Sequence, residues 1–314
     1  MKKEIKTDTA TLGGRIKSYE VEYETIVEPE DHLIIRIDGH HFSAFTKDCK
    51  KPFDKILSDS MIQATYKAVE RFNAYCGYTQ SDEITLFIPS LKDLTVDDRR
   101  TNKEKQNHKL NVRIRDDWEH QFSGRTQKLA SLVAAFITKE FNKAFRINAH
   151  AAWDYSDTAE HHKYCAKMDD LIGEAYFDAR VFGVPSTEEA FNIFMWRNRD
   201  CVKNSKSMFA QAYCSHKELQ NKNGEEQIQY CLEKTSKDWN TIEDKFKYGV
   251  FVKKELFEKE VDFRDLNYKD RDKFNTSEKQ TITRSRLVFI SKNISSFSKE
   301  NLEFVCSQYF NGDK

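Results

Sequence analysis

The chain has 314 residues, of which 39% are hydrophobic and 13% are aromatic, and it contains only 10 glycines and 4 prolines. This profile is that of a folded protein with one large domain or two modest ones, and it excludes fibrous and low-complexity chains. Lys plus Arg and Asp plus Glu both total 51, and this balance excludes a protein that coats nucleic acid through bulk charge.

The first part of the chain alternates strand and helix patterns. Residues 33–37 form a short apolar run rich in β-branched residues, which predicts a buried strand. Apolar residues recur at three- and four-residue steps between residues 54 and 75, which predicts a helix packed on the sheet. Residues 78–88 then predict a hairpin with a polar turn at residues 80–82. Residues 97–115 contain seven Lys or Arg residues and predict an exposed loop or insertion.

The next segments complete a recognisable order of elements. Ser123 is the predicted N-cap of a helix that continues through Phe141, and residues 175–184 predict a strand. Ser186 and Glu189 form a capping box that opens a long helix. Strand, helix, two strands, helix and strand is the order of the ferredoxin-like split βαβ fold, an α+β fold whose antiparallel sheet is covered on one face by two helices.

The C-terminal third is more charged and less periodic. We predict a catalytic domain at residues 1–216 and, packed on it, a helical and hairpin extension at residues 217–314. Strands are expected at residues 248–253 and 286–290 within this extension.

Carboxylates stand at two places that this topology brings together. Asp38 follows the first strand and precedes Gly39, whose backbone can approach a ligand closely, while Asp82 and Glu83 lie in the hairpin turn. The first strand should pair with the second hairpin strand, so these acids converge. Carboxylates held a few ångströms apart favour Mg²⁺, and paired metal ions can stabilise both oxygens of an in-line phosphoryl displacement. The pattern therefore suits nucleotidyl transfer.

Six short motifs in order, within about residues 12–253, carry a resemblance to a known family. The sequence resembles the tRNA-histidine guanylyltransferase family, with its R-[IL]-D-G-R-x-F, K-P-x-D, Q-S-D-E, F-D-[GA]-R-V, W-R-x-x-D-C and K-x-G-[TV] motifs. The matching strings are Arg36-Ile-Asp-Gly-His-His-Phe42, Lys51-Pro-Phe-Asp54, Gln80-Ser-Asp-Glu83, Phe177-Asp-Ala-Arg-Val181, Trp196-Arg197 with Asp200-Cys201, and Lys247-Tyr-Gly-Val250.

The resemblance implies a polymerase-palm-like fold and assigns roles to individual residues. Asp38, Asp82 and Glu83 would be catalytic, with two Mg²⁺ ions held by Asp38, Asp82 and the carbonyl of Gly39. The implied partners are tRNA, at its 5′ end and acceptor stem, and nucleotides; ATP and GTP or other NTPs would be substrates. A homotetramer is also implied, and no membrane partner is expected. The implied nucleotide contacts are Gly39, His40, His41, Phe42 and Ser43, mainly through their backbone, with Lys51, Asp54, Ser81, Asn204 and, for the phosphates of a second nucleotide, Arg125 and Lys128.

The implied reaction has three steps: ATP adenylylates a 5′-monophosphorylated RNA, the 3′-hydroxyl of an incoming NTP attacks the activated phosphate, and pyrophosphate is removed. Members that add one G to tRNA-His carry H-I-N-N-L-Y-N after W-R-x-x-D-C, whereas this chain has residues 202–208 there, with Val202 in place of His and only Asn204 retained. This departure resembles the guanylyltransferase-like proteins, which repair truncated tRNA 5′ ends by copying the opposite strand. His40 stands where the family motif has Arg, and the resemblance therefore does not establish a contact between the His40 side chain and a phosphate.

Two alternatives to templated repair remain from the sequence. Non-templated addition of G to tRNA-His is the first, and a palm-fold nucleotidyl cyclase, which would act on an NTP without RNA, is the second. The seven cysteines are widely spaced without a C-x-x-C pair, no apolar run is long enough to span a membrane, and the N-terminal residues lack a secretory signal. We therefore expect reduced thiols and an intracellular, cytoplasmic protein, with a mitochondrial location as the alternative.

Overall fold

The computed structural model describes residues 10–90, 120–261 and 280–310. The basic segment predicted at residues 97–115 as an exposed loop lies outside these residues. All seven cysteines lie within them and are free thiols. No helix in the described part of the chain is long and apolar enough to cross a membrane.

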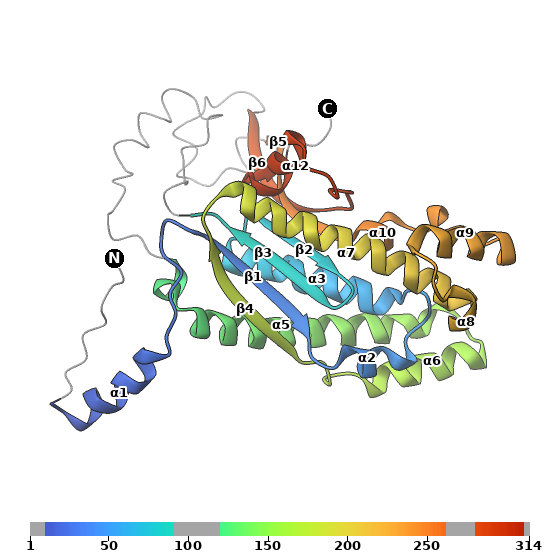
Figure 1. The fold of residues 1–314 in the computed structure, drawn as a ribbon, viewed down its shortest axis with the longest axis horizontal. Helices are drawn as coiled ribbons and strands as arrows, with labels where there is room; N and C mark the ends of the chain where they lie inside the picture. The colour runs from blue at the N-terminus through green and yellow to red at the C-terminus, as the bar shows by residue number, and fades with distance from the viewer. Residues whose placement is uncertain (1–9, 91–119, 262–279, 311–314) are drawn as a thin grey trace.

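A seven-stranded sheet forms the centre of the molecule (Figure 1). Its order is β4-β1-β3-β2-β5-β6, and the short β7 pairs with β5 in parallel while the other pairs are antiparallel. The order of the first four strands is that of the split βαβ fold, so the predicted fold class is confirmed. The strands are β1 (His32–Gly39), β2 (Cys76–Gln80), β3 (Glu83–Ile88), β4 (Phe177–Val184), β5 (Val250–Val261), β6 (Gln280–Ile290) and β7 (Tyr309–Phe310).

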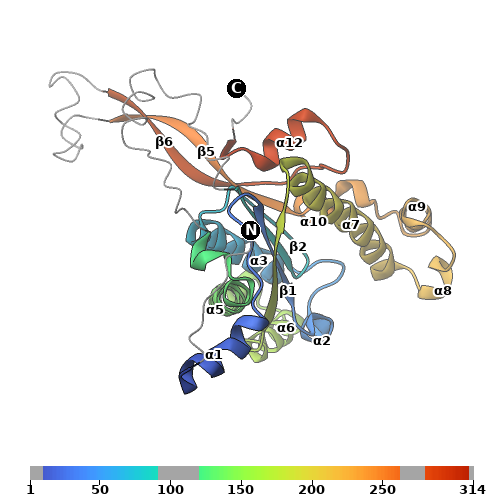
Figure 2. The same cartoon turned by 60° about the vertical axis from the view of Figure 1, so that its left-hand side comes forward.

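The helices α3 (Lys55–Phe72) and α5 (Thr126–Ala152) cover one face of the sheet. The helix α6 (Ala159–Asp170) packs on α5, and a short α2 (Phe42–Phe45) follows β1 (Figures 1 and 2). Alternate residues of β1 point to the two faces of the sheet. Ile35 and Ile37 join the core that the helices α3 and α5 build, whereas Ile34 points to the opposite face.

That opposite face is also covered, which the sequence analysis did not predict. The helix α7 (Thr187–Tyr213) packs there with α12 (Lys299–Cys306), and Phe191 and Phe194 of α7 form a second core with Ile34. Half of the predicted capping box is present: the Ser186 side chain accepts a hydrogen bond from the amide of Glu189, whereas the Glu189 carboxylate accepts from the side chain of Asn192. Coverage by two helices on one face was therefore an incomplete expectation, and the charged C-terminal third supplies part of the second layer.

The remaining elements lie at the periphery. The helices α8 (His216–Leu219), α9 (Gly224–Thr235) and α10 (Asp244–Tyr248) follow α7, while α1 (Leu12–Glu22) has no buried residue and extends from the body (Figure 1). Because β5 pairs with β2, the sheet continues across the domain boundary that was placed at residue 216. The division of the chain into two domains stays a prediction.

The start of α5 differs from the prediction. Ser123 lies in a short 3-10 segment with φ +57°, and the N-cap of α5 is Arg125. The amide of Val27 donates to the carbonyl of Gly124 at 2.9 Å, and Ile26 forms a β-bridge with Arg125. This contact with a distant segment holds residues 123–125 out of helical geometry, so Ser123 cannot act as a cap.

Candidate active site

The end of β1 and the β2–β3 turn meet as the topology predicted. Asp38 is paired with Glu83 in the antiparallel register of β1 and β3. The amide of Gly39 donates a hydrogen bond to the carbonyl of Asp82 at 3.1 Å, which ties the strand end to the turn. The three acids Asp38, Asp82 and Glu83 therefore stand together at one edge of the sheet.

The electrostatics of these acids show crowded negative charge. Burial raises the pKa of the Asp82 carboxyl, and the nearby charge of Asp38 raises it further. Burial also raises the pKa of Glu83, although the cation of Arg197 opposes the shift. Two buried carboxyls with raised pKa values beside a third acid form a candidate functional site, because a bound cation would stabilise their charged forms.

Arg197 of α7 neutralises Glu83 directly. The two side chains form an ion pair with 11% and 10% of their surfaces exposed, and Arg197 also contacts Asp200 at 3.2 Å. Gln80 donates to the Oε2 atom of Glu83 at 3.2 Å, whereas the buried Oε1 has no hydrogen-bond partner among the residues that the structure describes. The sequence analysis quoted the Trp196-Arg197 motif but gave Arg197 no role. A signal that could have identified Arg197 is that a buried acid such as Glu83 requires a cation beside it.

The carboxylates at this site fit Mg²⁺ that is bound together with a substrate phosphate. Among the described residues, no group of three or more His, Cys, Asp or Glu side chains is arranged to hold a metal ion. Mg²⁺ is, however, commonly held by one or two carboxylates together with substrate phosphates. Asp38 and Asp82, with the unpartnered Oε1 of Glu83 beside them, offer carboxylate oxygens of this kind. The residues therefore fit an ion that arrives with a nucleotide.

The segment after Asp38 is shaped mainly by packing. A Cβ atom on Gly39 would lie 2.3 Å from the Phe42 ring, which is why glycine is required there. Phe42 itself is buried against Phe141 and Phe177. Its side chain therefore cannot contact a nucleotide.

The backbone groups of this segment differ in how far they are free to bind. The amide of His40 already donates to the carbonyl of Tyr176 at 2.8 Å, so this amide is not free for the triphosphate contact that was predicted. His41 adopts a left-handed conformation with φ +54°, and both His41 and Ser43 are exposed.

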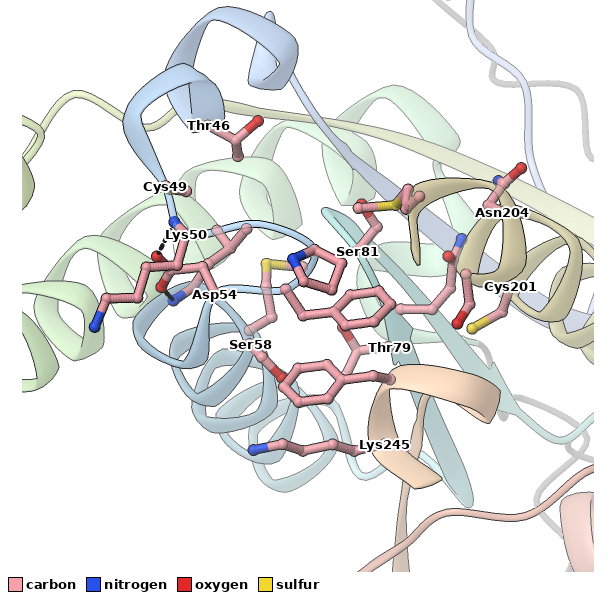
Figure 3. Close-up of a pocket in the computed structure, with 18 of the residues that line it drawn as sticks. Thr46, Cys49, Lys50, Asp54, Ser58, Thr79, Ser81, Cys201, Asn204 and Lys245 are labelled. Atoms are coloured by element: carbon pink, nitrogen blue, oxygen red, sulfur yellow. Dashed lines mark hydrogen bonds between the residues drawn. The ribbon is translucent and has the colours of Figure 1, made fainter. Parts of the chain in front are cut away.

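A cavity of about 310 Å³ opens beside the β2–β3 turn (Figure 3). This volume lies within the usual range of small-molecule sites. Four of the predicted nucleotide-binding residues, Lys51, Asp54, Ser81 and Asn204, line it. Its other walls include residues to which the sequence analysis gave no role, among them Thr46, Cys49, Phe53, Thr79, Cys201, Met208, Lys245 and Phe246.

The carboxylate of Asp54 is engaged within the protein. It caps α3 by accepting from the amide of Leu57 at 3.1 Å, and its other oxygen accepts from the amide of Lys50 at 2.8 Å and from the hydroxyl of Tyr164 at 2.7 Å. Asp54 is also 95% shielded from solvent, with 5% of its surface exposed. These contacts make Asp54 a support of the cavity wall.

We expect Asp54→Ala to lower the free energy of unfolding by about 2 kcal/mol, because it removes a helix cap and leaves a buried amide without its acceptor. Tyr164→Phe removes a single hydrogen bond and should cost about 1 kcal/mol. Urea unfolding followed by circular dichroism measures both changes. Equal stability of Asp54→Ala and the wild type would contradict the supporting role.

Arg125 and Lys128 lie at the other end of the sheet. Residues 124–126 contact residues 25–27, and Val27 lies against Gly183, which pairs with Leu33 at the start of β1. Five residue steps along β1, at about 3.3 Å each, separate Leu33 from Asp38 by about 17 Å. The fold of one chain therefore does not bring these two cations to the carboxylates.

Comparison with known proteins agrees with this architecture. The chain matches the model of the family described as Thg1, tRNAHis guanylyltransferase, over residues 13–185. It is 30% identical over 308 residues to the uncharacterized protein R259 of Acanthamoeba polyphaga mimivirus, a match that covers 96% of this chain and 91% of that protein.

Three solved structures resemble the chain. One is a bacterial tRNA(His) guanylyltransferase (Thg1)-like protein in complex with ATP, at 30% identity and a TM-score of 0.60 over 78% of this chain and 87% of that one. A bacterial protein of the same description in complex with GTP shows 26% identity and a TM-score of 0.59 over 90% and 93%. The tRNA(His) guanylyltransferase of Saccharomyces cerevisiae, at 19% identity and a TM-score of 0.53 over 74% and 90%, is similar in fold.

Proposed function

The chain belongs to the tRNAHis guanylyltransferase family, whose members are nucleotidyltransferases that act on tRNA, and we propose that it repairs truncated tRNA 5′ ends by templated 3′-to-5′ addition. The observation that carries this proposal is the convergence of Asp38 and Asp82 beside a nucleotide-sized cavity. Relatives of this chain bind ATP and GTP, which are the substrates that the reaction needs.

The proposed mechanism relies on position and charge. A nucleotide in the cavity would rest near Lys51 and Ser81, with its phosphates directed toward the turn that carries Asp82. Within the described ranges, the single hydrogen bond that the Lys51 ammonium group donates is a long one, of 3.5 Å to the Thr46 carbonyl, so this group is available for a phosphate. Bound Mg²⁺, held by Asp38, Asp82 and the carbonyl of Gly39, would supply neutralisation of the attacking and leaving oxygens.

The three proposed steps share this place. The 5′-phosphate of the RNA displaces pyrophosphate from ATP, the 3′-hydroxyl of the incoming NTP then displaces AMP, and hydrolysis removes pyrophosphate from the new 5′ end. No side-chain nucleophile is needed, since alignment of the reacting oxygens and neutralisation of their charge carry the catalysis. Glu83, which the family resemblance assigned a catalytic role, is here proposed to position the turn through its contacts with Arg197 and Gln80.

Templated repair rather than addition of a single G is supported by the residues that border the cavity. The segment 202–208 departs from the pattern of the G-adding members, and Asn204, Ser205, Ser207 and Met208 of this segment line the cavity. A different wall at the nucleotide site is consistent with selection of the nucleotide by the opposite RNA strand. Arg125 and Lys128 remain proposed contacts of a second nucleotide, away from the carboxylates, and the homotetramer remains a prediction.

We expect the protein, given ATP, NTPs and Mg²⁺, to extend a 5′-truncated, 5′-monophosphorylated tRNA until the acceptor stem is fully paired. Gel analysis of the labelled 5′ end measures the products. The same tRNA with a 5′-hydroxyl is the control and should not react, because it offers no phosphate for adenylylation. Addition of G regardless of the opposing base, or formation of a product from NTP without RNA, would contradict the proposal.

A further inference from the structure

The edge strand β4 leaves one face open next to Asp38. Direct pairing in the register of β1 and β4 places Asp178 beside Asp38, Arg180 beside Arg36 and Phe182 beside Ile34. Paired residues of antiparallel strands point to the same face. On the other face of β4, Phe177, Ala179 and Val181 pack into the core that α3 and α5 cover. The face that carries Asp178 and Arg180 is therefore the face of Asp38, and these two side chains are about half exposed.

Exposed aromatic rings gather on this open face. Phe182 is 36% exposed on the edge strand, where it is paired with Ile34 of β1. Tyr176 is 60% exposed, and the hydrogen bond from the His40 amide to its carbonyl continues the ladder between β1 and β4. Strand alternation then places the ring of Tyr176 on the side of Asp178.

The helix α7 adds a third ring above the same area. Trp196 is 52% exposed, and its indole is flanked by the guanidinium groups of Arg36 at 5.6 Å and Arg197 at 4.5 Å. Tyr176, which directly precedes β4, and Phe182 are six residue steps apart, about 20 Å, and the register places Asp178 and Arg180 between them. Exposed aromatic side chains spaced along one face and interleaved with arginines suit single-stranded nucleic acid, because bases stack on the rings and phosphates bind the guanidinium groups.

The arginines on this face favour a ligand that carries phosphate groups. The guanidinium of Arg180 lies 4.0 Å from a carboxylate oxygen of Asp38 and 3.6 Å from one of Asp178. With Arg36 in register, it places two cations between Asp38 and the ring of Phe182, whereas Tyr176 lies on the opposite side of Asp178. A phosphodiester that crosses this face would therefore meet positive charge immediately before it reaches Asp38.

We propose that Tyr176, Phe182 and Trp196, with Arg36 and Arg180, form a stacking platform for the unpaired nucleotides of the RNA strand opposite the truncated 5′ end. The proposal rests on the templated function proposed above, in which the base being copied must lie one base pair from the reacting phosphate. The platform adjoins Asp38 on the side away from β3, which leaves the cavity side free for the incoming nucleotide.

Binding can be measured without catalysis, so that the platform and the reaction are tested separately. The probe is a fluorescently labelled hairpin RNA with an acceptor-like stem and several unpaired 3′ nucleotides, titrated with the full chain without ATP or Mg²⁺. A hairpin of the same stem with a fully paired end is the reference RNA. We expect the wild type to bind the first RNA at least about tenfold more tightly, given the stacking energy of a base on an aromatic ring.

Substitutions then assign the difference to the rings. Phe182→Leu, which keeps most of the apolar volume, and Tyr176→Ala should each weaken binding of the overhang RNA about tenfold and leave binding of the paired RNA unchanged. Phe182→Tyr and Tyr176→Phe should bind the overhang RNA as tightly as the wild type, because both substitutions retain an aromatic ring. Tyr155→Ala is the control, since this exposed tyrosine directly follows α5, which lies on the other side of the sheet.

The outcomes are distinct for the two proposals. Equal binding of the two RNAs by the wild type, or equal affinity of Phe182→Leu and Tyr155→Ala for the overhang RNA, would overturn the platform. Overhang-specific binding that depends on the rings, in a protein that extends no truncated tRNA, would support the platform and contradict the proposed reaction.

Discussion

Asp38→Asn and Asp82→Asn should each lower the rate of nucleotide addition at least about a thousandfold while the protein remains folded. Loss of a carboxylate that would hold Mg²⁺ at the reacting phosphate is expected to cost about 4 kcal/mol of transition-state stabilisation, and each 1.4 kcal/mol is about tenfold in rate. Both adenylylation of the RNA and addition of the nucleotide should be lost. The measurement is single-turnover kinetics on truncated tRNA, with each step followed separately.

The fold should not suffer from these changes. Burial raises the pKa of Asp82 and the charge of Asp38 adds to the shift, so the charge of Asp38 destabilises ionised Asp82 when no cation is bound. Removing one charge from this crowded pair therefore removes a repulsion. We expect the free energy of unfolding of Asp38→Asn to equal or exceed that of the wild type when Mg²⁺ is absent.

Asp178→Asn provides a matched control. Asp178 is paired with Asp38 in the register of β1 and β4 and shares its sheet face, but it lies on the side of β1 away from Asp82. Its variant should retain most of the activity. Full activity of Asp38→Asn or Asp82→Asn, or an equal loss in Asp178→Asn, would exclude the proposed metal-binding role of this acid pair.

Arg197→Met is the substitution with the largest expected effect on stability, a loss of about 3–5 kcal/mol. The guanidinium of Arg197 is almost fully buried with Glu83, and its removal leaves an uncompensated carboxylate in the interior. Breaking a buried ion pair from one side costs more than exchanging both partners for neutral groups. Equilibrium unfolding in urea measures the change.

A second variant separates the unpaired charge from a packing defect. Glu83→Gln combined with Arg197→Met contains no buried charge at this position, so most of the lost stability should return. Lys203→Met, on an exposed position of the same helix, should change stability by less than about 0.5 kcal/mol. If the double variant were as unstable as Arg197→Met, packing of the methionine rather than the charge of Glu83 would explain the loss.

Much of the active centre was predictable because it depends on local patterns and on one topological rule. An apolar run followed by Asp38 and Gly39 identifies the end of a strand, and Asp82 within a polar turn identifies a hairpin. The pairing of the first strand with the second hairpin strand then follows from the order of elements. Lys51 and Ser81 were assigned through the family resemblance, and they do line the cavity.

Other features depend on contacts between residues far apart in the chain. Asp54 was expected to contact a nucleotide, but Tyr164, which is 110 positions away, holds one of its oxygens. Arg125 and Lys128 have the composition of a phosphate site, but the bridge between Ile26 and Arg125 fixes them at the far end of the sheet. A sequence motif specifies which side chains are present and leaves their partners open.

The sequence by itself determined the alternation of strands and helices, the antiparallel palm-like sheet and the meeting of Asp38 with Asp82, because periodicity and chain order are local properties that each segment carries with it. Only the tertiary structure decided that α7 covers the second face, that Arg197 neutralises Glu83 and that Phe182 and Tyr176 remain exposed on the sheet face of Asp38. These features arise from the packing of whole elements against one another, and the free energy of burial that selects among such packings depends on all of the elements together.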